Sequence, residues 1–351
     1  MNSFTDKVVL VTGGTGSFGK AVARLLLSRG VGEVRVFSRD EEKQDLMRGE
    51  FDGRAVKYFI GDVRDRHSVD QAMNGVDLVF HAAALKQVPS CEFFPMQAIL
   101  TNVVGSSNVV ESAIAHSVSK VVCLGTDKAV FPINAMGMSK ALMEKVVQAS
   151  ARNQGDSRTI LSSVRYGNVM MSRGSVIPLF IRQLRQGQQV TLTHSEMTRF
   201  LMPMGEAVDL VLHALANARQ GDTFIRKAPA STIGDLAEAV QQLFGIRAGV
   251  RVIGVRHGEK MFETLVSAEE LTRSEDMGDY YRVSMDGRSL DYGRFFTDGD
   301  PEIASHVDFD SNNARRLTVA GVVELLRTVP EIASMLSDDS SSATRPATAE
   351  N

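Results

Sequence analysis

The first half of the chain alternates short apolar runs with longer segments of helical periodicity. The strand-like apolar runs cover residues 8–12, 33–38, 55–60, 76–81, 120–125 and 160–166. The segments with helical periodicity cover residues 18–27, 68–73, 96–116 and 135–151. Continuous apolar strands that alternate with helices are typical of a parallel sheet covered on both faces. The pattern therefore predicts a doubly wound α/β nucleotide-binding domain over residues 1–168.

The second half is less regular and predicts a smaller lobe. An apolar helix is expected over 176–184, and short strand and helix candidates follow through residue 271, then a strand over 280–283 and a last helix over 319–335. We expect residues 169–336 to form mainly a substrate-binding lobe, with some segments returning to the sheet. Residues 278–300 are rich in Asp, Gly, Arg and Tyr, which predicts an ordered arm. Residues 337–351 are polar and are expected to be a disordered tail.

Composition narrows the class of protein. The 351 residues are 43% hydrophobic and 23% charged, with a formal net charge of −3, so nothing favours nucleic acid as a partner. Cys91 and Cys123 are too few for a disulfide framework and are expected to be buried and reduced. No signal peptide and no apolar run of about 20 residues is present, which predicts a cytoplasmic protein without membrane insertion.

A glycine-rich turn follows the first predicted strand and opens onto the first predicted helix. Its sequence, TGGTGSFG over residues 12–19, permits a tight turn at Gly13 and a close approach of the backbone to a pyrophosphate at Gly16. Gly19 lets the helix pack closely on the strand, and the helix N-terminus adds N–H donors for phosphate. The residues expected to bind a dinucleotide here are Gly13, Thr15, Gly16, Ser17, Phe18 and Gly19.

The end of the second predicted strand bears on the choice between NAD and NADP. An acidic residue there suits the ribose of NAD, whereas arginine suits the 2′-phosphate of NADP. Ser38, Arg39 and Lys43 can contact that phosphate, so we expect NADP. Asp40 leaves NAD as the alternative, and Lys43 can equally be a solvated charge. The other residues expected to line the cofactor pocket are Asp62, Val63, Ala82, Ala83 and Ala84.

The segment after the fifth predicted strand holds the candidate catalytic groups. Thr126, Asp127 and Lys128 stand at the strand end, and Lys140 stands in the following predicted helix. Met136 precedes Lys140 by one helical turn. Because strand ends of a doubly wound sheet form its ligand crevice, we expect these groups there. The alternatives are a surface ion pair in a loop for Asp127 and Lys128, and core packing for Met136.

These motifs resemble the extended short-chain dehydrogenase/reductases, whose members carry Ser or Thr followed by Tyr-x-x-x-Lys. By that resemblance, Thr126 matches the Ser/Thr, Met136 matches the tyrosine, and Lys140 matches the lysine that holds the nicotinamide ribose. The Thr-Asp-Lys element resembles the inverting UDP-N-acetylglucosamine 4,6-dehydratases, which also epimerise C5. Longer strings at 81–95, 165–170 and 256–260 are similar to the branch that starts UDP-N-acetyl-L-fucosamine synthesis for bacterial capsule and O-antigen.

A 4,6-dehydration takes hydride from C4, a proton from C5 and water from C6, and returns hydride to C6. The C4 ketone acidifies the C5 proton, so Lys128 can act as base and Asp127 can protonate the leaving hydroxyl. Met136 cannot exchange a proton, so the C4 hydroxyl proton must go to Lys128, to Thr126 through a water, or elsewhere. The cofactor is regenerated and is expected to stay bound. The resemblance also implies C3 epimerisation, which no residue here demonstrates.

Polar residues expected to hold UDP-N-acetylglucosamine fall in four short segments: Lys86 and Glu92; Asn168, Arg173, Ser175 and Val176; Thr198 and Arg199; Arg256 and Glu259. The first pair can reach the sugar or be solvated in a loop. The second segment precedes a helix N-terminus, which suits a diphosphate. The resemblance places phosphate and uridine contacts in the last two segments, with a structural salt bridge as the alternative for the final pair. No cluster has metal-ligand spacing, so no metal is expected.

Two alternative functions are also compatible with parts of this pattern. A UDP-N-acetylglucosamine 4-epimerase would share the fold, cofactor and substrate, but it has no use for Asp127 and Lys128. A non-catalytic NADP-binding scaffold or sensor is favoured by Met136, whereas the retention of Lys140 argues against it. The resemblance also implies a homo-oligomer, with the 278–300 arm as a candidate interface.

Overall fold

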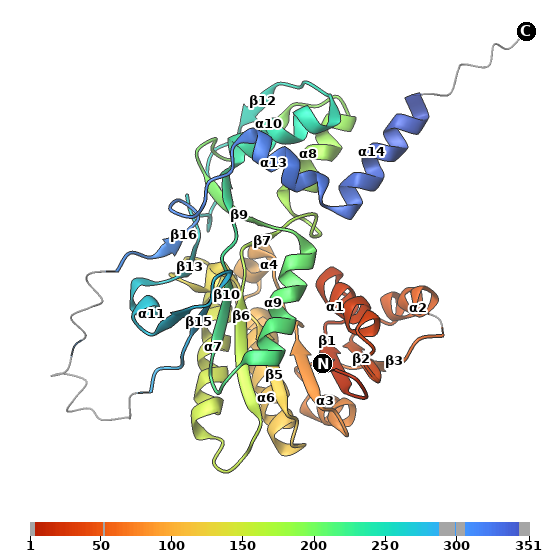
Figure 1. Cartoon of the computed structure of the whole chain (residues 1–351), viewed down its shortest axis with the longest axis vertical. Helices are drawn as coiled ribbons and strands as arrows, with labels where there is room; N and C mark the ends of the chain where they lie inside the picture. The colour runs from red at the N-terminus through yellow and green to blue at the C-terminus, as the bar shows by residue number, and fades with distance from the viewer. Residues whose placement is uncertain (1–3, 52, 288–298, 300–305, 344–351) are drawn as a thin grey trace, which may run out of the picture. The chain divides into compact units, whose positions relative to one another are not determined.

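The computed structural model describes residues 4–51, 53–287, 299 and 306–343 (Figure 1). The chain divides into two compact units. The first comprises Met1–Gly167, Gly205–Ala228 and Glu263–Asp310, and the second comprises Asn168–Met204, Pro229–Phe262 and Ser311–Asn351. The chain thus leaves the first unit close to the expected boundary at residue 168 and returns to it twice.

The first unit is built on a nine-stranded sheet within the described residues, in the order β14-β15-β10-β6-β5-β4-β1-β2-β3. Seven neighbouring strands from β3 to β10 run parallel, and β15 and β14 add an antiparallel edge. The strands are β1 (Val8–Thr12), β2 (Glu33–Ser38), β3 (Val56–Ile60), β4 (Leu78–His81), β5 (Lys120–Leu124), β6 (Ile160–Arg165), β10 (Thr223–Arg226), β14 (Ser274–Asp276) and β15 (Tyr280–Val283). The order of β1 to β6 is that of the doubly wound dinucleotide-binding fold, so the predicted fold class is confirmed.

Helices connect these parallel strands because the chain must cross from the carboxyl end of one strand back to the amino end of the next. They are α1 (Ser17–Ser28), α2 (Glu41–Glu50), α3 (Arg66–Met73), α4 (Val88–Phe93), α5 (Pro95–Ala98), the π-helix η1 (Ile99–Val104), α6 (Gly105–Ala115), the 3₁₀ turn η2 (Asp127–Ala129), α7 (Ala135–Asn153), α9 (Met204–Asn217) and α11 (Ala268–Thr272). The unit also contains the small antiparallel pair β13 (Thr264–Val266) and β16 (Phe309–Asp310). Its core combines strand residues such as Leu10, Val79 and Val121 with helix residues such as Val109 and Met143.

The register of the parallel strands brings distant segments to one edge of the sheet. Thr12 pairs with Phe37 and with His81, His81 pairs with Cys123, and Leu124 pairs with Val164. The loops that follow β1, β2, β4, β5 and β6 therefore leave the sheet side by side. These loops carry the glycine turn, the predicted phosphate contacts and the Thr-Asp-Lys element.

The second unit is smaller and has its own apolar core, centred on residues such as Phe180, Leu236 and Val322. Its elements are β7 (Asn168–Val169), α8 (Val176–Arg185), β8 (Val190–Leu192), β9 (Thr198–Met202), β11 (Ala230–Thr232), α10 (Ile233–Phe244), β12 (Val250–Val252), α13 (Val319–Arg327) and α14 (Pro330–Ala343). Strands β11, β9 and β7 form one small sheet, and β12 and β8 form another.

Three predicted elements differ from the structure. The helix expected over 96–116 is divided into α5, the π-helical η1 and α6. The last helix expected over 319–335 is broken before Pro330, because proline cannot continue a helix from the preceding turn. The expected disordered tail is wrong for residues 337–343, which continue α14, since extending an existing helix costs little compared with starting one.

Two helices were not expected at all, α2 and α4. The sequence of α2 is polar on nearly every side, and only Gln44 and Met47 are buried, so its apolar periodicity is weak. Within the expected arm, β15 pairs with β10 and β14, whereas residues 288–298 and 300 lie outside the described residues. Cys91 and Cys123 are both free and buried, as expected.

Candidate active site

The glycine turn between β1 and α1 is shaped for close approach of a ligand. Gly13 has a φ of 66°, and its N–H donates to the Phe37 carbonyl oxygen at 2.8 Å. A Cβ at Gly13 would lie 2.8 Å from the Ala83 nitrogen, so no larger residue fits there. Gly16 caps α1 without a side-chain hydrogen bond, so the helix N-terminus is not covered by a side chain of its own cap. The turn thus presents backbone where a phosphate would bind.

The loop after β2 carries paired charges. Arg39 Nη1 lies 3.5 Å from Asp62 Oδ2, and Lys43 forms an ion pair with Asp40. Asp40 is also the N-cap of α2, because its Oδ1 accepts from the Lys43 backbone N–H at 3.0 Å. Burial tends to raise the pKa of Asp62, but Arg64 and Arg39 together hold that pKa below its usual value. Arg39 remains more than half exposed.

Ser38 and the alanines after β4 lie at the same sheet edge. Ser38 is buried, and its Oγ accepts from Gln44 Nε2 at 3.2 Å. The Ala82 and Ala83 N–H groups donate to the Thr12 carbonyl and hydroxyl oxygens at 3.2 and 3.3 Å. These bonds hold the Ala82–Ala84 backbone next to the glycine turn, and Val63 is buried in the core beneath it.

His81 is buried between two hydroxyl groups. Its Nδ1 lies 2.7 Å from Thr12 Oγ1, and its Nε2 lies 2.8 Å from Ser106 Oγ. Burial, with a further contribution from the Lys140 charge, lowers the pKa of His81 to about 3. The neutral, fully paired ring fits the structural role expected for this residue.

The Thr-Asp-Lys element forms a compact turn at the end of β5. Thr126 is the N-cap of η2, and its hydroxyl donates to Asp127 Oδ1 at 2.9 Å. The Asp127 side chain is 1% exposed, and the Lys128 Nζ lies 3.0 Å from its Oδ1. A Cβ at Gly137 would collide with the Lys128 carbonyl oxygen, so the first turn of α7 packs directly on η2. Asp127 is therefore buried and Lys128 is a quarter exposed, which is contrary to the alternative of a surface ion pair in a loop.

A second carboxylate joins this pair from a distant part of the sequence. Glu263 Oε1 lies 3.5 Å from Lys128 Nζ, and the Glu263 side chain is 3% exposed. Glu263 immediately precedes β13 in the last segment of the first unit. Sequence reasoning did not find it, because nothing in the sequence links residue 263 to residue 128. Its only signal was a charged residue bordering a short apolar run just after the 256–260 motif.

Lys140 occupies a different environment one helical turn after Met136. Its Nζ donates to the Leu124 carbonyl oxygen at 2.7 Å and lies 3.6 Å from the Met143 sulfur. Burial lowers the pKa of Lys140 to about 8, although Cys123 and Glu144 act in the opposite direction. Met136 is 5% exposed and packs against Cys91 and Ala98. The residue at the tyrosine position is thus part of the core, in line with the packing alternative.

A buried network of ion pairs connects α7 with β6 and α11. Arg165 donates to the Glu144 carboxylate at 2.6 Å and to the Glu270 carboxylate at 2.7 Å. Its Nη1 also donates to the Leu265 carbonyl oxygen at 3.2 Å. Burial raises the pKa of Glu270, but the Arg165 guanidinium outweighs burial and holds that pKa below its usual value. The network ties α7, β6 and the 263–270 segment together, so it fixes the elements that carry Lys140 and Glu263.

The two predicted sugar contacts after β4 have different settings. Glu92 Oε1 accepts from the Ala135 backbone N–H at 2.6 Å, at the first residue of α7. Lys86 is exposed. Both belong to the first unit, and Glu92 is positioned by the same helix that carries Met136 and Lys140.

The remaining predicted substrate residues lie in the second unit. The Asn168 Oδ1 and Ser175 Oγ atoms are buried and have no hydrogen-bond partner among the described residues. Ser175 is the N-cap of α8, Val176 begins that helix, and Arg173 before it is exposed. Buried polar atoms without partners are costly, so the Ser175 hydroxyl at the N-terminus of α8 suits a polar ligand there.

Thr198 and Arg199 are held by protein groups. Thr198 Oγ1 lies 2.8 Å from Ser311 Oγ. Arg199 is 7% exposed and donates to the Thr198 and Lys260 carbonyl oxygens at 2.7 and 2.9 Å. Arg256 Nη2 and Glu259 Oε1 lie 2.5 Å apart in an ion pair in which Arg256 is largely exposed. Arg199 thus anchors the loop that bears the Arg256–Glu259 pair.

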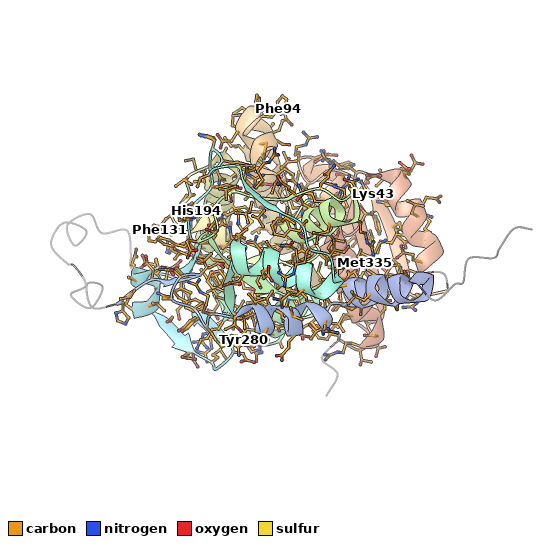
Figure 2. The ribbon with its side chains drawn as sticks, turned by 90° about the horizontal axis from the view of Figure 1, so that it is seen from above. Lys43, Phe94, Phe131, His194, Tyr280 and Met335 are labelled. Carbon is orange, nitrogen blue, oxygen red and sulfur yellow. The ribbon has the colours of Figure 1, made fainter. Side chains whose placement is uncertain are left out.

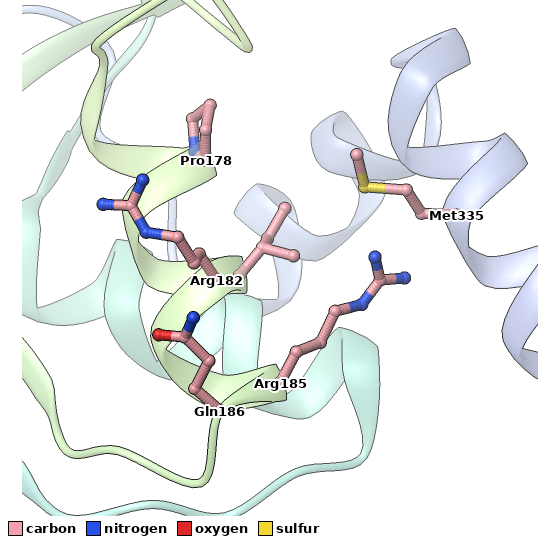
Figure 3. Close-up of a pocket in the computed structure, with 6 residues that line it drawn as sticks. Pro178, Arg182, Arg185, Gln186 and Met335 are labelled. Atoms are coloured by element: carbon pink, nitrogen blue, oxygen red, sulfur yellow. The ribbon is translucent and has the colours of Figure 1, made fainter.

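One pocket of about 300 Å³ lies between α8 and α14 of the second unit. Figure 3 shows Arg182 and Arg185 on α8 and Met335 on the facing helix. The residues that line it are Pro178, Ile181, Arg182, Arg185, Gln186 and Met335, none of which is a predicted site residue.

Among the residues that the structure describes, no group of His, Cys, Asp and Glu side chains could hold a metal ion. No described helix has the length and apolar character to cross a membrane.

The sheet order and the strand-end site together define an extended short-chain dehydrogenase/reductase fold of the type found in sugar-nucleotide epimerases and dehydratases. Residues 9–285 match the model of a family described as polysaccharide biosynthesis protein, and residues 286–333 match its C-terminal model. The chain belongs to this polysaccharide biosynthesis protein family.

Three relatives illustrate the similarity. A protein of Rickettsia typhi named UDP-glucose 4-epimerase is 55% identical over 330 residues, which cover 93% of this chain and 97% of the relative. The structure of Pen from Bacillus thuringiensis has a TM-score of 0.83 and 36% identity, and covers 92% of this chain and 98% of that one. A dTDP-glucose 4,6-dehydratase from Streptomyces venezuelae, solved with NAD bound, has a TM-score of 0.65 and 23% identity, with coverage of 72% and 86%. At that identity the last comparison concerns the fold alone.

Proposed function

We propose that this protein is an NADP-dependent UDP-N-acetylglucosamine 4,6-dehydratase that inverts C5, in surface-polysaccharide biosynthesis. The observation that carries the proposal is the Lys128 amine at the end of β5, held against the buried carboxylates of Asp127 and Glu263. An enzyme that only moves hydride to and from C4 needs no acid at C6 and no base at C5. A dehydratase needs both, at a water-poor strand end. The buried Asp127 carboxyl group and the adjacent Lys128 amine meet that need.

The residues of the first unit fit a dinucleotide. Gly13, Gly16 and the N-terminus of α1 would hold the pyrophosphate, since a Cβ at Gly13 would block the approach. Arg39, with Lys43 nearby, would hold the 2′-phosphate, and Lys140 would hold the nicotinamide ribose. Asp40 already caps α2, which leaves it less suited to bind the ribose of NAD. Bound NADP would accept hydride from C4 and return it to C6.

The protein groups then divide the proton transfers. Lys128 takes the proton from C5, and the electron pair moves onto the C4 carbonyl oxygen. Asp127 gives a proton to the C6 hydroxyl, which leaves as water. Reprotonation of C5 on the opposite face gives UDP-2-acetamido-2,6-dideoxy-L-arabino-hexos-4-ulose. Met136 takes no part in proton transfer, so the C4 hydroxyl proton leaves by one of two routes. Either Thr126 and a water relay it to solvent, or Lys128 accepts it and releases it to solvent from its exposed side before the amine takes the C5 proton.

A second candidate function is a UDP-glucose or UDP-N-acetylglucosamine 4-epimerase, because the Rickettsia relatives bear the name UDP-glucose 4-epimerase. Incubation with each UDP-sugar in D₂O, followed by NMR, distinguishes the two. A 6-deoxy-4-keto product with deuterium at C5 supports the dehydratase. A C4 epimer with an intact C6 hydroxyl supports the epimerase, and the absence of turnover supports a nucleotide-binding scaffold.

A variant pair tests the role of Lys128. Lys128→Ala should abolish deuterium exchange at C5 while NADP remains bound, because the base is removed and the cofactor loop is untouched. Lys145→Ala, on the exposed side of α7, serves as the control and should exchange normally. Continued exchange in Lys128→Ala would remove Lys128 as the base.

We also propose that the protein is a homo-oligomer. Exposed large apolar side chains gather on α4, α5, η1, α7 and the loop before α7, and these helices contact one another. Phe94 and Phe131 of this set are labelled in Figure 2. The set comprises Phe93, Phe94, Met96, Ile99, Val104, Phe131, Ile133, Met138 and Leu142. Light scattering should show a smaller particle for Leu142→Ser and an unchanged one for the control Val307→Ser. An unchanged mass for both would place the interface elsewhere.

A further inference from the structure

Glu263 is the one member of the strand-end cluster that no motif pointed to. Asp127 is adjacent to Lys128 in the same 3₁₀ turn, so their contact follows from local geometry. Glu263 reaches Lys128 only because the chain returns to the first unit at residue 263. Both carboxylates are almost completely buried, whereas a quarter of the Lys128 side chain is exposed. A carboxylate is costly to bury, and here it is buried against the reactive amine.

The segment that carries Glu263 is held firmly. Strand β13, which begins at the next residue, pairs with β16 and contacts η2. Arg165 donates to the Leu265 carbonyl oxygen at 3.2 Å and binds Glu270 further along the segment. The position of the Glu263 carboxylate is thus set by the sheet and by a buried arginine, and does not depend on Lys128 alone.

We propose that Glu263 is the positioning residue of Lys128: its carboxylate aims the amine at C5 and stabilises the ammonium that forms when the amine accepts the C5 proton. The inference rests on the proposed dehydratase function. It follows the arrangement in which a base is oriented by a third, charged group. The C5–H bond breaks, an N–H bond forms at Lys128, and the electron pair moves to the C4 oxygen. Glu263 itself exchanges no proton.

Other ionisable groups surround this pair and are common to the wild type and the variants. On the elements that pack against η2 and β13 they include Asp127 on η2, Arg165 on β6 with its partner Glu270, Tyr166 after β6, Lys140 and Glu144 on α7, and Asp310 on β16. A change confined to residue 263 therefore reports on the Glu263 charge against an otherwise constant background.

The test is the rate of C5 deuterium exchange in the holoenzyme with UDP-N-acetylglucosamine as a function of pH. Glu263→Gln keeps the size of the side chain and removes its charge. We expect its maximal exchange rate to fall about tenfold or more, since a less stabilised ammonium means a weaker base. The alkaline rise of the rate should move to lower pH, because the carboxylate no longer favours the ammonium form. KM should change little, and Glu263→Asp should recover part of the rate.

Controls separate this role from a structural one. Glu275→Gln, an exposed position on β14, should behave as wild type. A Glu263→Gln enzyme with wild-type rate and pH profile would overturn the inference. Absence of exchange in the wild type would instead refute the proposed function itself.

Discussion

Replacement of Lys140 by methionine should stabilise the nucleotide-free protein at neutral pH. Lys140 is 5% exposed, and burial lowers its pKa from 10.5 to about 8. That difference corresponds to about 3 kcal/mol, by which the buried ammonium destabilises the native state. Methionine is of similar length and carries no charge. It loses the hydrogen bond to the Leu124 carbonyl oxygen, which costs about 1 kcal/mol. The net gain at pH 7 is then about 2 kcal/mol.

The gain in folding stability from Lys140→Met should become smaller as the pH rises. Below about pH 8 the amine is charged in both states, so the full cost of burial is present. Between about pH 8 and pH 10.5 the native amine is neutral while the unfolded one still binds a proton, so the cost disappears progressively. The advantage of Lys140→Met over wild type should therefore fall to about zero near pH 10.

Equilibrium urea unfolding of both proteins at pH 7 and pH 10 measures this difference. Lys145→Met, at an exposed position on the same helix, is the control and should match wild type at both pH values. A variant less stable than wild type at pH 7, or a gap of equal size at both pH values, would refute the reasoning. The variant should also lose activity, because stability and function make opposite demands on this lysine.

Two further predictions concern packing and buried charge. Gly19→Ala should weaken dinucleotide binding about tenfold or more, because a Cβ would lie 2.6 Å from the Gly13 carbonyl oxygen and displace α1 from the turn. Calorimetric titration measures this, and an unchanged affinity would contradict it. Arg165→Met should lower the free energy of unfolding by about 3–5 kcal/mol, since Glu144 and Glu270 would stay buried without their cation. Urea unfolding measures this, and a loss below about 1 kcal/mol would contradict it.

Much of the first unit could be predicted because its physical causes are local. Apolar runs such as 8–12 and 120–124 are buried on both faces, which only a covered parallel strand requires. The glycine turn needs Gly13 at positive φ, and that requirement is visible in the residue type itself. The Thr-Asp-Lys element follows a strand directly, so its place at the sheet edge followed from the strand order.

Other elements depended on contacts that sequence patterns do not carry. Helix α2 has almost no apolar face, and its Gln44 is held by bonds to Ser38 and Phe59 that form only when β2 and β3 lie side by side. The division of 96–116 into two helices and a π-helical turn has no local signal in the residues. The helical residues 337–343 are polar, and they extend a helix whose buried Ile332 is anchored in the core of the second unit.

The sequence by itself determined the class of fold, the glycine turn and the chemical groups at the end of β5, because residue type and spacing set each of these. Only the tertiary structure decided how deeply those groups are buried and which charged groups lie next to them. Lys128 and Lys140 are the same residue type, yet one lies between two carboxylates and the other against a carbonyl oxygen and a sulfur. Burial and charge partners are set by long-range packing, and they give the two amines different electrostatic surroundings.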